Sequence, residues 1–138
     1  MAYNFLSTDC IVCAVMDARC SQVYNALFEI KNGVVTRLCD DRALSLDDLK
    51  NELLSVDGRI IIAGDGTDIT CKYIGNEIKN AESAPVNLKY QRASSTALVA
   101  FEMINNGQTV SAQKLMPVYL RLPQAQRELN KKLGGRTK

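Results

Sequence analysis

Histidine is absent from this 138-residue chain, and that absence restricts its chemistry more than any other feature of its composition. Without an imidazole there can be no Ser-His or Cys-His nucleophilic pair, no histidine metal ligand and no histidine acid–base catalysis. Tryptophan is absent too, and aromatic residues make up only 6% of the chain, so aliphatic side chains must form the core. We therefore predict no catalytic residue, no metal site and no cofactor.

Long apolar runs are also absent. No stretch approaches the roughly 20 apolar residues of a membrane span, and residues 1–9 have neither the basic nor the apolar region of a signal peptide. Five cysteines, an odd number, fit free thiols in a reducing cytosol better than a disulfide framework. With 46% hydrophobic and 23% charged residues, the composition is typical of one soluble globular domain, which we expect to be cytoplasmic and not bound to a membrane.

The chain has little net charge except at its C-terminal end. The net charge is only +2, but residues 122–138 hold five basic side chains against one acidic, a local balance of +4. We predict a basic C-terminal helix here, with Pro123 at its first position and Gly134-Gly135 at its end. Its cations could contact nucleic-acid phosphates, or simply suit the helix dipole. We favour the second interpretation.

The hydrophobic pattern predicts an α/β domain with the order β-β-β-α-β-α-β-α. Apolar, β-branched runs predict five strands, over residues 10–16, 23–30, 34–39, 59–63 and 83–88. Amphipathic spacing predicts three helices, over residues 45–56, from 67 or 68 to about 78, and 91–106. Asn32-Gly33 predicts a tight hairpin, Ser45 a helix N-cap and Gly107 a helix end. Three antiparallel strands followed by a parallel one give a mixed sheet of ribonuclease H-like topology, the unit of actin-like nucleotide-binding proteins.

Three short signatures lie where strands or helices should end. They are Asp17-Ala18-Arg19 followed by Val23 and Tyr24, then Gly64-Asp65-Gly66, then Pro117-Val118-Tyr119-Leu120-Arg121. In actin-like lobes a strand–turn–strand cradles phosphate with backbone N–H groups, and a later strand–Gly–helix junction receives the adenosine. At the first junction Ala18 and Arg19 replace the glycines that would let the backbone curl round a phosphate. The second junction keeps its glycines.

Of the two junctions that would bind a nucleotide, only the second therefore keeps its glycines. Gly64, Asp65 and Gly66 are candidates for a vestigial nucleotide site, although a plain tight strand-to-helix turn is the favoured interpretation. Asp17 is expected to fix its loop as a hydrogen-bond acceptor and not to act as a catalytic acid. Tyr119 is expected to pack beneath the last helix, with Arg121 holding an acidic group or a helix end.

At these three signatures the chain resembles the TsaB family, also called YeaZ, of the glycoprotease-like superfamily. Pro-x-Tyr-Leu-Arg, ending at Arg121, is the most specific element, and Asp-Ala-Arg followed by Val-Tyr is the next. The resemblance covers nearly the whole chain, although Cys20 stands where a basic residue is common in the family. It implies a degenerate protein with the actin-like ATPase fold, acting without catalysis of its own in tRNA modification (threonylcarbamoyladenosine biosynthesis). Because the basic C-terminal residues are best explained by the helix dipole, direct contact of this chain with tRNA is not expected.

The resemblance also implies partner proteins, and an N-terminal lobe that residues 1–138 do not include. The family works with a catalytic subunit, TsaD, and an ATPase, TsaE, and its N-terminal lobe has no counterpart in residues 1–138. We therefore expect the C-terminal lobe of a two-lobed parent, acting through protein–protein contacts and, as an isolated fragment, forming a homodimer through an uncovered apolar face such as that of the 91–106 helix. The alternative is the ATP-binding lobe of an actin-like enzyme, suggested by Gly64-Asp65-Gly66.

Overall fold

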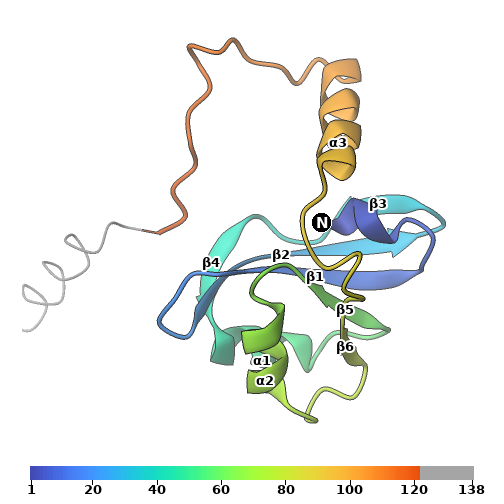
Figure 1. Ribbon diagram of the computed structural model, residues 1–138, viewed down its shortest axis with the longest axis vertical. Coiled ribbons are helices and arrows are strands. Elements are labelled where there is room, and N and C mark those ends of the chain that lie inside the picture. The colour runs from blue at the N-terminus through green and yellow to red at the C-terminus, as the bar shows by residue number, and fades with distance from the viewer. Residues whose placement is uncertain (122–138) are drawn as a thin grey trace, which may run out of the picture.

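The computed structural model describes residues 1–121, whereas the predicted basic C-terminal helix and tail, residues 122–138, lie outside the described part. A sheet of six strands forms the centre, with helices on its faces (Figure 1). In chain order the elements are η1 (Ala2–Phe5), β1 (Cys10–Asp17), β2 (Gln22–Lys31), β3 (Val34–Arg37), β4 (Arg42–Ser45), α1 (Leu46–Leu53), β5 (Ile60–Ala63), α2 (Thr67–Ile74), β6 (Ala81–Ser83) and α3 (Ala93–Asn105).

The strand order confirms the predicted topology. The sheet runs β3-β2-β1-β5-β6, with β2 antiparallel to both β1 and β3, and β5 parallel to both β1 and β6. Asn32 and Gly33 join β2 to β3 with φ of 51° and 76°, the positive values that a type I′ turn needs. The chain is therefore an α/β domain with the mixed sheet of a ribonuclease H-like, actin-like lobe.

The sequence analysis missed one strand. β4 pairs with the first four residues of β2, and β3 pairs with the last four, so the two short strands lie end to end along the same edge. Ser45 closes β4 and also caps α1, since its side chain accepts a hydrogen bond from the Asp48 N–H at 3.0 Å. The predicted cap is confirmed, and the strand before it went unrecognised because its four residues lack a run of β-branched side chains.

Two other predicted boundaries were wrong. The strand expected over 83–88 is instead Ala81–Ser83, because Pro85 has no N–H to continue the ladder and residues 85–88 form a turn. α2 begins after Gly66 and ends at Ile74, short of Ile78. The Thr67 hydroxyl does not cap the helix but donates to the carbonyl of Gly64 at 2.7 Å.

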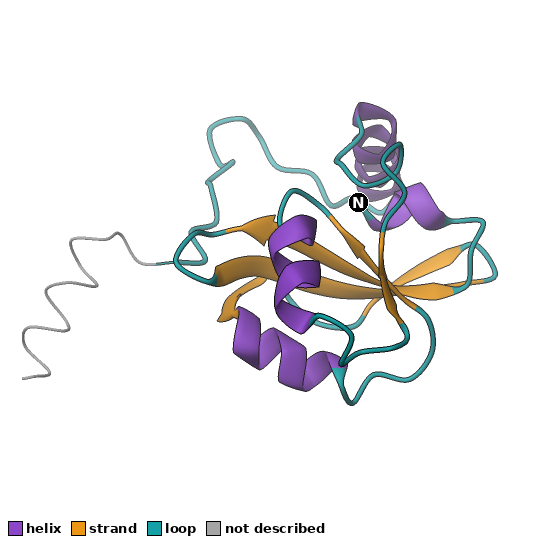
Figure 2. Ribbon diagram, turned by 60° about the horizontal axis from the view of Figure 1, so that its bottom comes forward, coloured by secondary structure: helices purple, strands orange, loops and turns teal. Residues whose placement is uncertain are grey.

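Both faces of the sheet carry buried side chains. α1 and α2 cover one face (Figure 2), where Leu49, Leu53 and Ile74 pack on Cys13 and Ile62. A smaller cluster lies on the opposite face, and its members are Ala2, Phe5, Cys10, Val12, Ile30, Ile61, Ala63 and Ala84. The short η1 covers this second face only in part.

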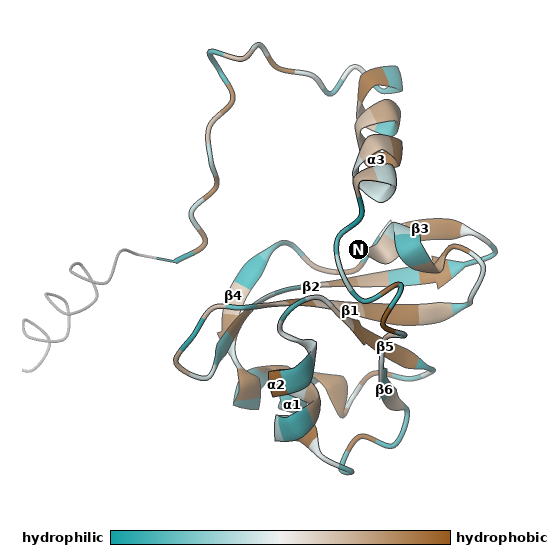
Figure 3. Cartoon of the chain, in the orientation of Figure 1, coloured by the Kyte–Doolittle hydropathy of each residue, from teal (hydrophilic) through white to brown (hydrophobic). Residues whose placement is uncertain are grey.

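α3 projects away from the sheet (Figure 1) and packs mainly against η1. Ser95 is its single buried residue. The hydropathy colouring shows that the exposed helix is largely apolar (Figure 3). Its predicted small-residue face therefore has no element of the described chain packed along it, and from Gly107 (φ 67°) the chain arches back toward the β1–β2 turn. None of the helices in residues 1–121 is long and apolar enough to cross a membrane.

Candidate functional site

The three sequence signatures meet at one end of the sheet. β1 and β5 are parallel, so their carboxyl ends, at Asp17 and Ala63, lie at the same edge. The Gly66 N–H donates to the Val15 carbonyl at 3.2 Å, and the Asp17 N–H donates to Asp65 Oδ1 at 3.2 Å. The third signature reaches the same place, where the Arg121 guanidinium donates to the Ala18 carbonyl. The three signatures thus form one cluster, although the first and the third are about a hundred residues apart in the chain.

The two glycines of the second signature permit a very close approach to β1. A Cβ added at Gly64 would lie 1.9 Å from the Val15 carbonyl oxygen, and the backbone there has φ of +122°. A Cβ at Gly66 would lie 3.1 Å from the Asp17 nitrogen. Packing of the β5–α2 turn on the end of β1 therefore accounts for both glycines, which favours the tight-turn interpretation. The vestigial nucleotide role of Gly64, Asp65 and Gly66 stays a prediction.

The first signature forms an unusual turn between β1 and β2. Arg19, Cys20 and Ser21 all adopt positive φ, of 63°, 54° and 55°, although none is glycine. Asp17 supports this turn, because its Oδ1 accepts a hydrogen bond from the Arg19 N–H at 2.7 Å. Its carboxylate also lies 3.2 Å from the Arg19 guanidinium, an exposed pair of small energetic weight. Asp17 is therefore the loop-fixing acceptor that the sequence predicted.

Val23 and Tyr24 follow this turn and point to opposite faces of the sheet. Val23 is fully buried in the core beneath α1, whereas Tyr24 lines a cavity on the other face. These two residues thus fix β2 in its register and place an aromatic side chain beside the third signature. Ala18, in the turn before them, is buried and offers its carbonyl to Arg121.

The third signature lies over the sheet as an extended strap, defined here as residues 117–121. Tyr119 was expected to pack beneath the last helix, which lies outside the described residues, so this stays a prediction; the Tyr119 side chain is 84% exposed. Within residues 1–121, Arg121 donates to the Ala18 carbonyl and pairs with no acidic side chain. Pro117 starts the strap, and Leu120 is partly buried.

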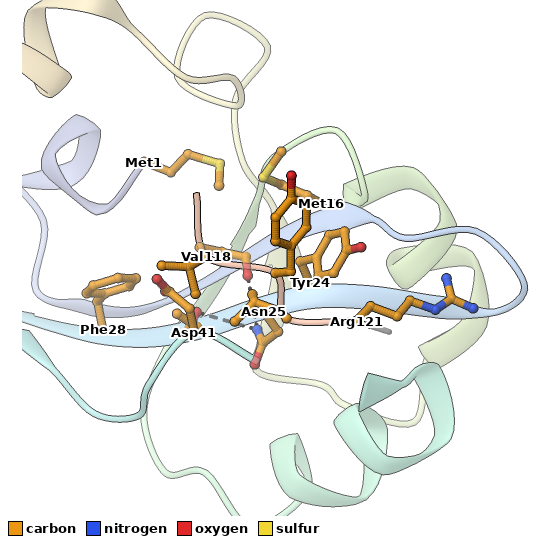
Figure 4. A pocket seen from close by; sticks show the side chains of 12 residues that line it. Met1, Met16, Tyr24, Asn25, Phe28, Asp41, Val118 and Arg121 are labelled. Carbon is orange, nitrogen blue, oxygen red and sulfur yellow. Dashed lines mark hydrogen bonds between the residues drawn. The ribbon is translucent and has the colours of Figure 1, made fainter. Parts of the chain in front are cut away.

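Beneath the strap lies an apolar cavity of about 450 Å³. The sheet side is formed by Ala14, Met16, Tyr24, Ala26 and Phe28 of β1 and β2. Figure 4 shows Tyr24 and Phe28 standing on β2, with Val118 between them in this view and Met1 across the opening. The cavity is therefore bounded by two of the signatures and by the N-terminal turn.

Asn25, at the edge of this cavity, makes hydrogen bonds that the sequence analysis did not predict. Its Nδ2 donates to the Ala14 carbonyl at 3.0 Å, and its Oδ1 accepts from the Arg42 guanidinium at 3.0 Å. Arg42 in turn pairs with Glu52 at 2.6 Å. All the polar atoms of this buried side chain are satisfied, so it ties β1, β2 and β4 together and leaves no free donor for a ligand.

Lys89 is a second residue that the sequence analysis missed. It is 7% exposed, its ammonium pairs with Asp68 at 2.6 Å, and its carbonyl accepts the Gly64 N–H at 2.7 Å. Because it bonds both the glycine turn and the first turn of α2, it holds the β5–α2 junction in place. Sequence patterns gave no signal for it, since a single lysine in a loop is ordinarily exposed.

The chemistry available at this site is limited. In the described part of the chain no group of three or more Cys, Asp or Glu side chains could hold a metal ion. Cys10 and Cys13 lie on opposite faces of the sheet, in separate core clusters, because residues three apart in a strand point to opposite faces. Burial raises the pKa of Cys13 to about 12, so its thiolate scarcely forms near neutral pH.

Comparison with known proteins finds solved structures with a similar fold. No protein-family description matches the chain, and no curated sequence matches it. Among solved structures, the chain has the fold of an uncharacterized protein with similarity to peptidase YeaZ from Pseudomonas aeruginosa, with a TM-score of 0.59 and 20% identity over 87% of this chain and 53% of that one.

YeaZ from Pseudomonas aeruginosa is the second such structure, with a TM-score of 0.53 and 20% identity over 80% of this chain and 49% of that one. The chain therefore has the fold of a YeaZ-type, actin-like lobe. It spans about half the length of each of these two proteins.

Proposed function

We propose that this chain is the C-terminal lobe of a TsaB-like protein, a non-catalytic subunit of the complex that makes threonylcarbamoyladenosine on tRNA. The observation that carries the proposal is the meeting of three family-like signatures at one end of a YeaZ-type fold. Each signature is held there by backbone contacts, which suits a structural module. Through the full-length parent, the partners would be a TsaD-like catalytic subunit and a TsaE-like ATPase.

The test is made in cells, on the protein as it is encoded there. Depleting it should lower the threonylcarbamoyladenosine content of tRNA, measured by mass spectrometry of nucleosides, and the parent protein should capture the TsaD-like subunit in a pull-down. Wild-type protein should restore the modification, as should a control variant at an exposed ion pair, Arg59→Ala, which loses only its pair with Glu82. Normal modification in depleted cells would refute the proposal.

An ATP-binding lobe is the second candidate, and one observation favours it. A smaller cavity of about 240 Å³ lies over the glycine turn, lined by Met1, Met16, Gly64, Asp65, Tyr90 and Gln91. Calorimetry with ATP and magnesium separates the two candidates, because micromolar binding that Gln91→Ala weakens would favour the nucleotide site. Gly64→Val is unsuitable here, since the contact with Val15 would unfold the turn whatever it binds.

A further inference from the structure

The strap of residues 117–121 is an apolar segment that the described part of the chain leaves uncovered. Val118 and Tyr119 line the cavity of about 450 Å³ beneath it, yet these two residues are 83% and 84% exposed. Within residues 1–121, the one hydrogen bond that anchors the strap joins the Arg121 guanidinium to the Ala18 carbonyl. Exposed apolar surface of this kind marks a place where other polypeptide packs.

The surface around the strap is apolar as well. Ala14 and Phe28 belong to the sheet side of the cavity, and the polar groups at its margin are already engaged. Asn25 is fully hydrogen-bonded, and Asp41 pairs with Arg37 at 2.7 Å. Burying a polar group without a partner is unfavourable, so this surface suits an occupant that presents apolar side chains.

The chain continues from the strap into the C-terminal tail, residues 122–138, which lie outside the described part. In the sequence of this tail Ala125, Leu129 and Leu133 recur every four residues, the spacing of one helix face, and Gly134-Gly135 follow as a helix end. An amphipathic helix of about eleven residues is marginal in water by itself. It therefore needs an apolar surface against which its leucines can pack.

The strap and the predicted tail helix have matching lengths. A helix over residues 123–133 is about 16 Å long, at 1.5 Å per residue, and the five extended residues of the strap span about 17 Å at most. Pro123 is suited to the first position of a helix. A turn just before it would let the helix run back along the whole strap, antiparallel to it, and bring Leu133 beside Val118.

Charge favours the same course for the tail. The whole chain has a net charge of +2 and its C-terminal tail has +4, so the described part is negative by two. In the view of Figure 4, Asp41 and Val118 lie at the same end of the cavity, the end that the basic side chain of Lys132 would reach. Asp40 precedes Asp41, is exposed, and takes part in none of the ion pairs of the described residues.

We propose that residues 122–133 form a helix that folds back along the strap of the same chain and covers the cavity, with Leu129 and Leu133 packed on Val118 and Tyr119. The basic side chains of the helix stay on its outer face and at the acidic end of the cavity. The expectation that Tyr119 packs beneath the last helix follows from this arrangement. The inference concerns the packing of this chain on itself and does not rest on the proposed function.

Hydrogen–deuterium exchange of the 138-residue chain, followed by mass spectrometry, tests the proposal. We expect the amides of residues 123–133 to exchange at least tenfold more slowly than unstructured amides, because a packed helix protects them and an isolated helix of this length does not. Leu129→Asn in the tail and Val118→Asn in the strap should each remove most of this protection. Asp40→Asn should reduce it about twofold, since an exposed charge contact contributes little.

Two matched control variants should leave the protection of the tail unchanged. Leu115→Asn replaces an apolar residue that is 71% exposed on the arch before the strap, and Gln124→Asn alters the polar face of the tail helix. Val118 is itself 83% exposed, so Val118→Asn should not unfold the domain, which circular dichroism checks. A wild-type tail without protection would overturn the proposal, as would protection that Val118→Asn leaves intact.

Nuclear Overhauser contacts identify the surface that the tail covers. The methyl protons of Leu129 and Leu133 should contact the ring protons of Tyr119. In a mixture of isotope-labelled and unlabelled chains, these contacts should arise within one chain. Contacts that arise between chains would overturn the proposal, and so would contacts of these methyl groups with α3 in place of the strap.

Discussion

Replacing Gly64 with alanine tests whether close packing, and not a ligand, requires this glycine. The new Cβ would lie 1.9 Å from the Val15 carbonyl oxygen and 2.9 Å from its carbon, so β1 or the glycine turn must move. The backbone conformation, at φ +122°, costs an L residue about 2 kcal/mol, and overpacking adds about 2 kcal/mol more. We therefore expect Gly64→Ala to lower the free energy of unfolding by about 4 kcal/mol.

Gly58→Ala is the matched control for this experiment. Gly58 also has positive φ, at +87°, but a Cβ there would meet nothing within 4 Å, so only the backbone cost of about 1 kcal/mol applies. Urea unfolding followed by circular dichroism suits a protein without tryptophan, and 4 kcal/mol corresponds to a midpoint shift of about 2 M. If the two variants lose the same stability, the contact between Gly64 and Val15 does not constrain this turn and our reasoning is wrong.

Two further predictions concern titratable groups. At pH 8 iodoacetamide should label exposed Cys20 first, and Cys13 should stay unlabelled in the folded protein, because burial raises its pKa to about 12; early labelling of Cys13 in a mass-spectrometric time course would contradict this. The hydrogen bond to Glu102 raises the pKa of Tyr3 to about 12, so its stabilising contribution is complete below pH 10 and is lost as pH rises through 12. Ultraviolet titration should show a late component that Tyr3→Phe removes; an unchanged titration curve would refute the assignment.

Local sequence signals predicted the centre of the fold well. A continuous apolar run gave β1, Asn32-Gly33 gave the hairpin and Ser45 gave the start of α1, because in each case the deciding interaction lies within a few residues. The errors arose where distant partners decide. β4 exists because β2 is long enough to pair with two strands, and residues 83–88 turn away because Pro85 cannot extend the ladder.

The candidate site was predictable only in part. Parallel strands bring their carboxyl ends to one edge, so the first two signatures could be expected to meet there. The reach of Arg121 back to the Ala18 carbonyl depends on the path of the chain after α3, which no local pattern specifies. The buried contacts of Asn25 and Lys89 likewise follow from tertiary packing.

The short strands at both edges of the sheet affect how the folded protein behaves at high concentration. One margin is formed by β3 and β4, of four residues each, and the other by β6, of three residues. Neither presents a long row of free backbone N–H and carbonyl groups on which another strand could extend, so growth of fibrils by strand addition has no template here. The folded domain is thus protected at both edges of its sheet against association through added strands.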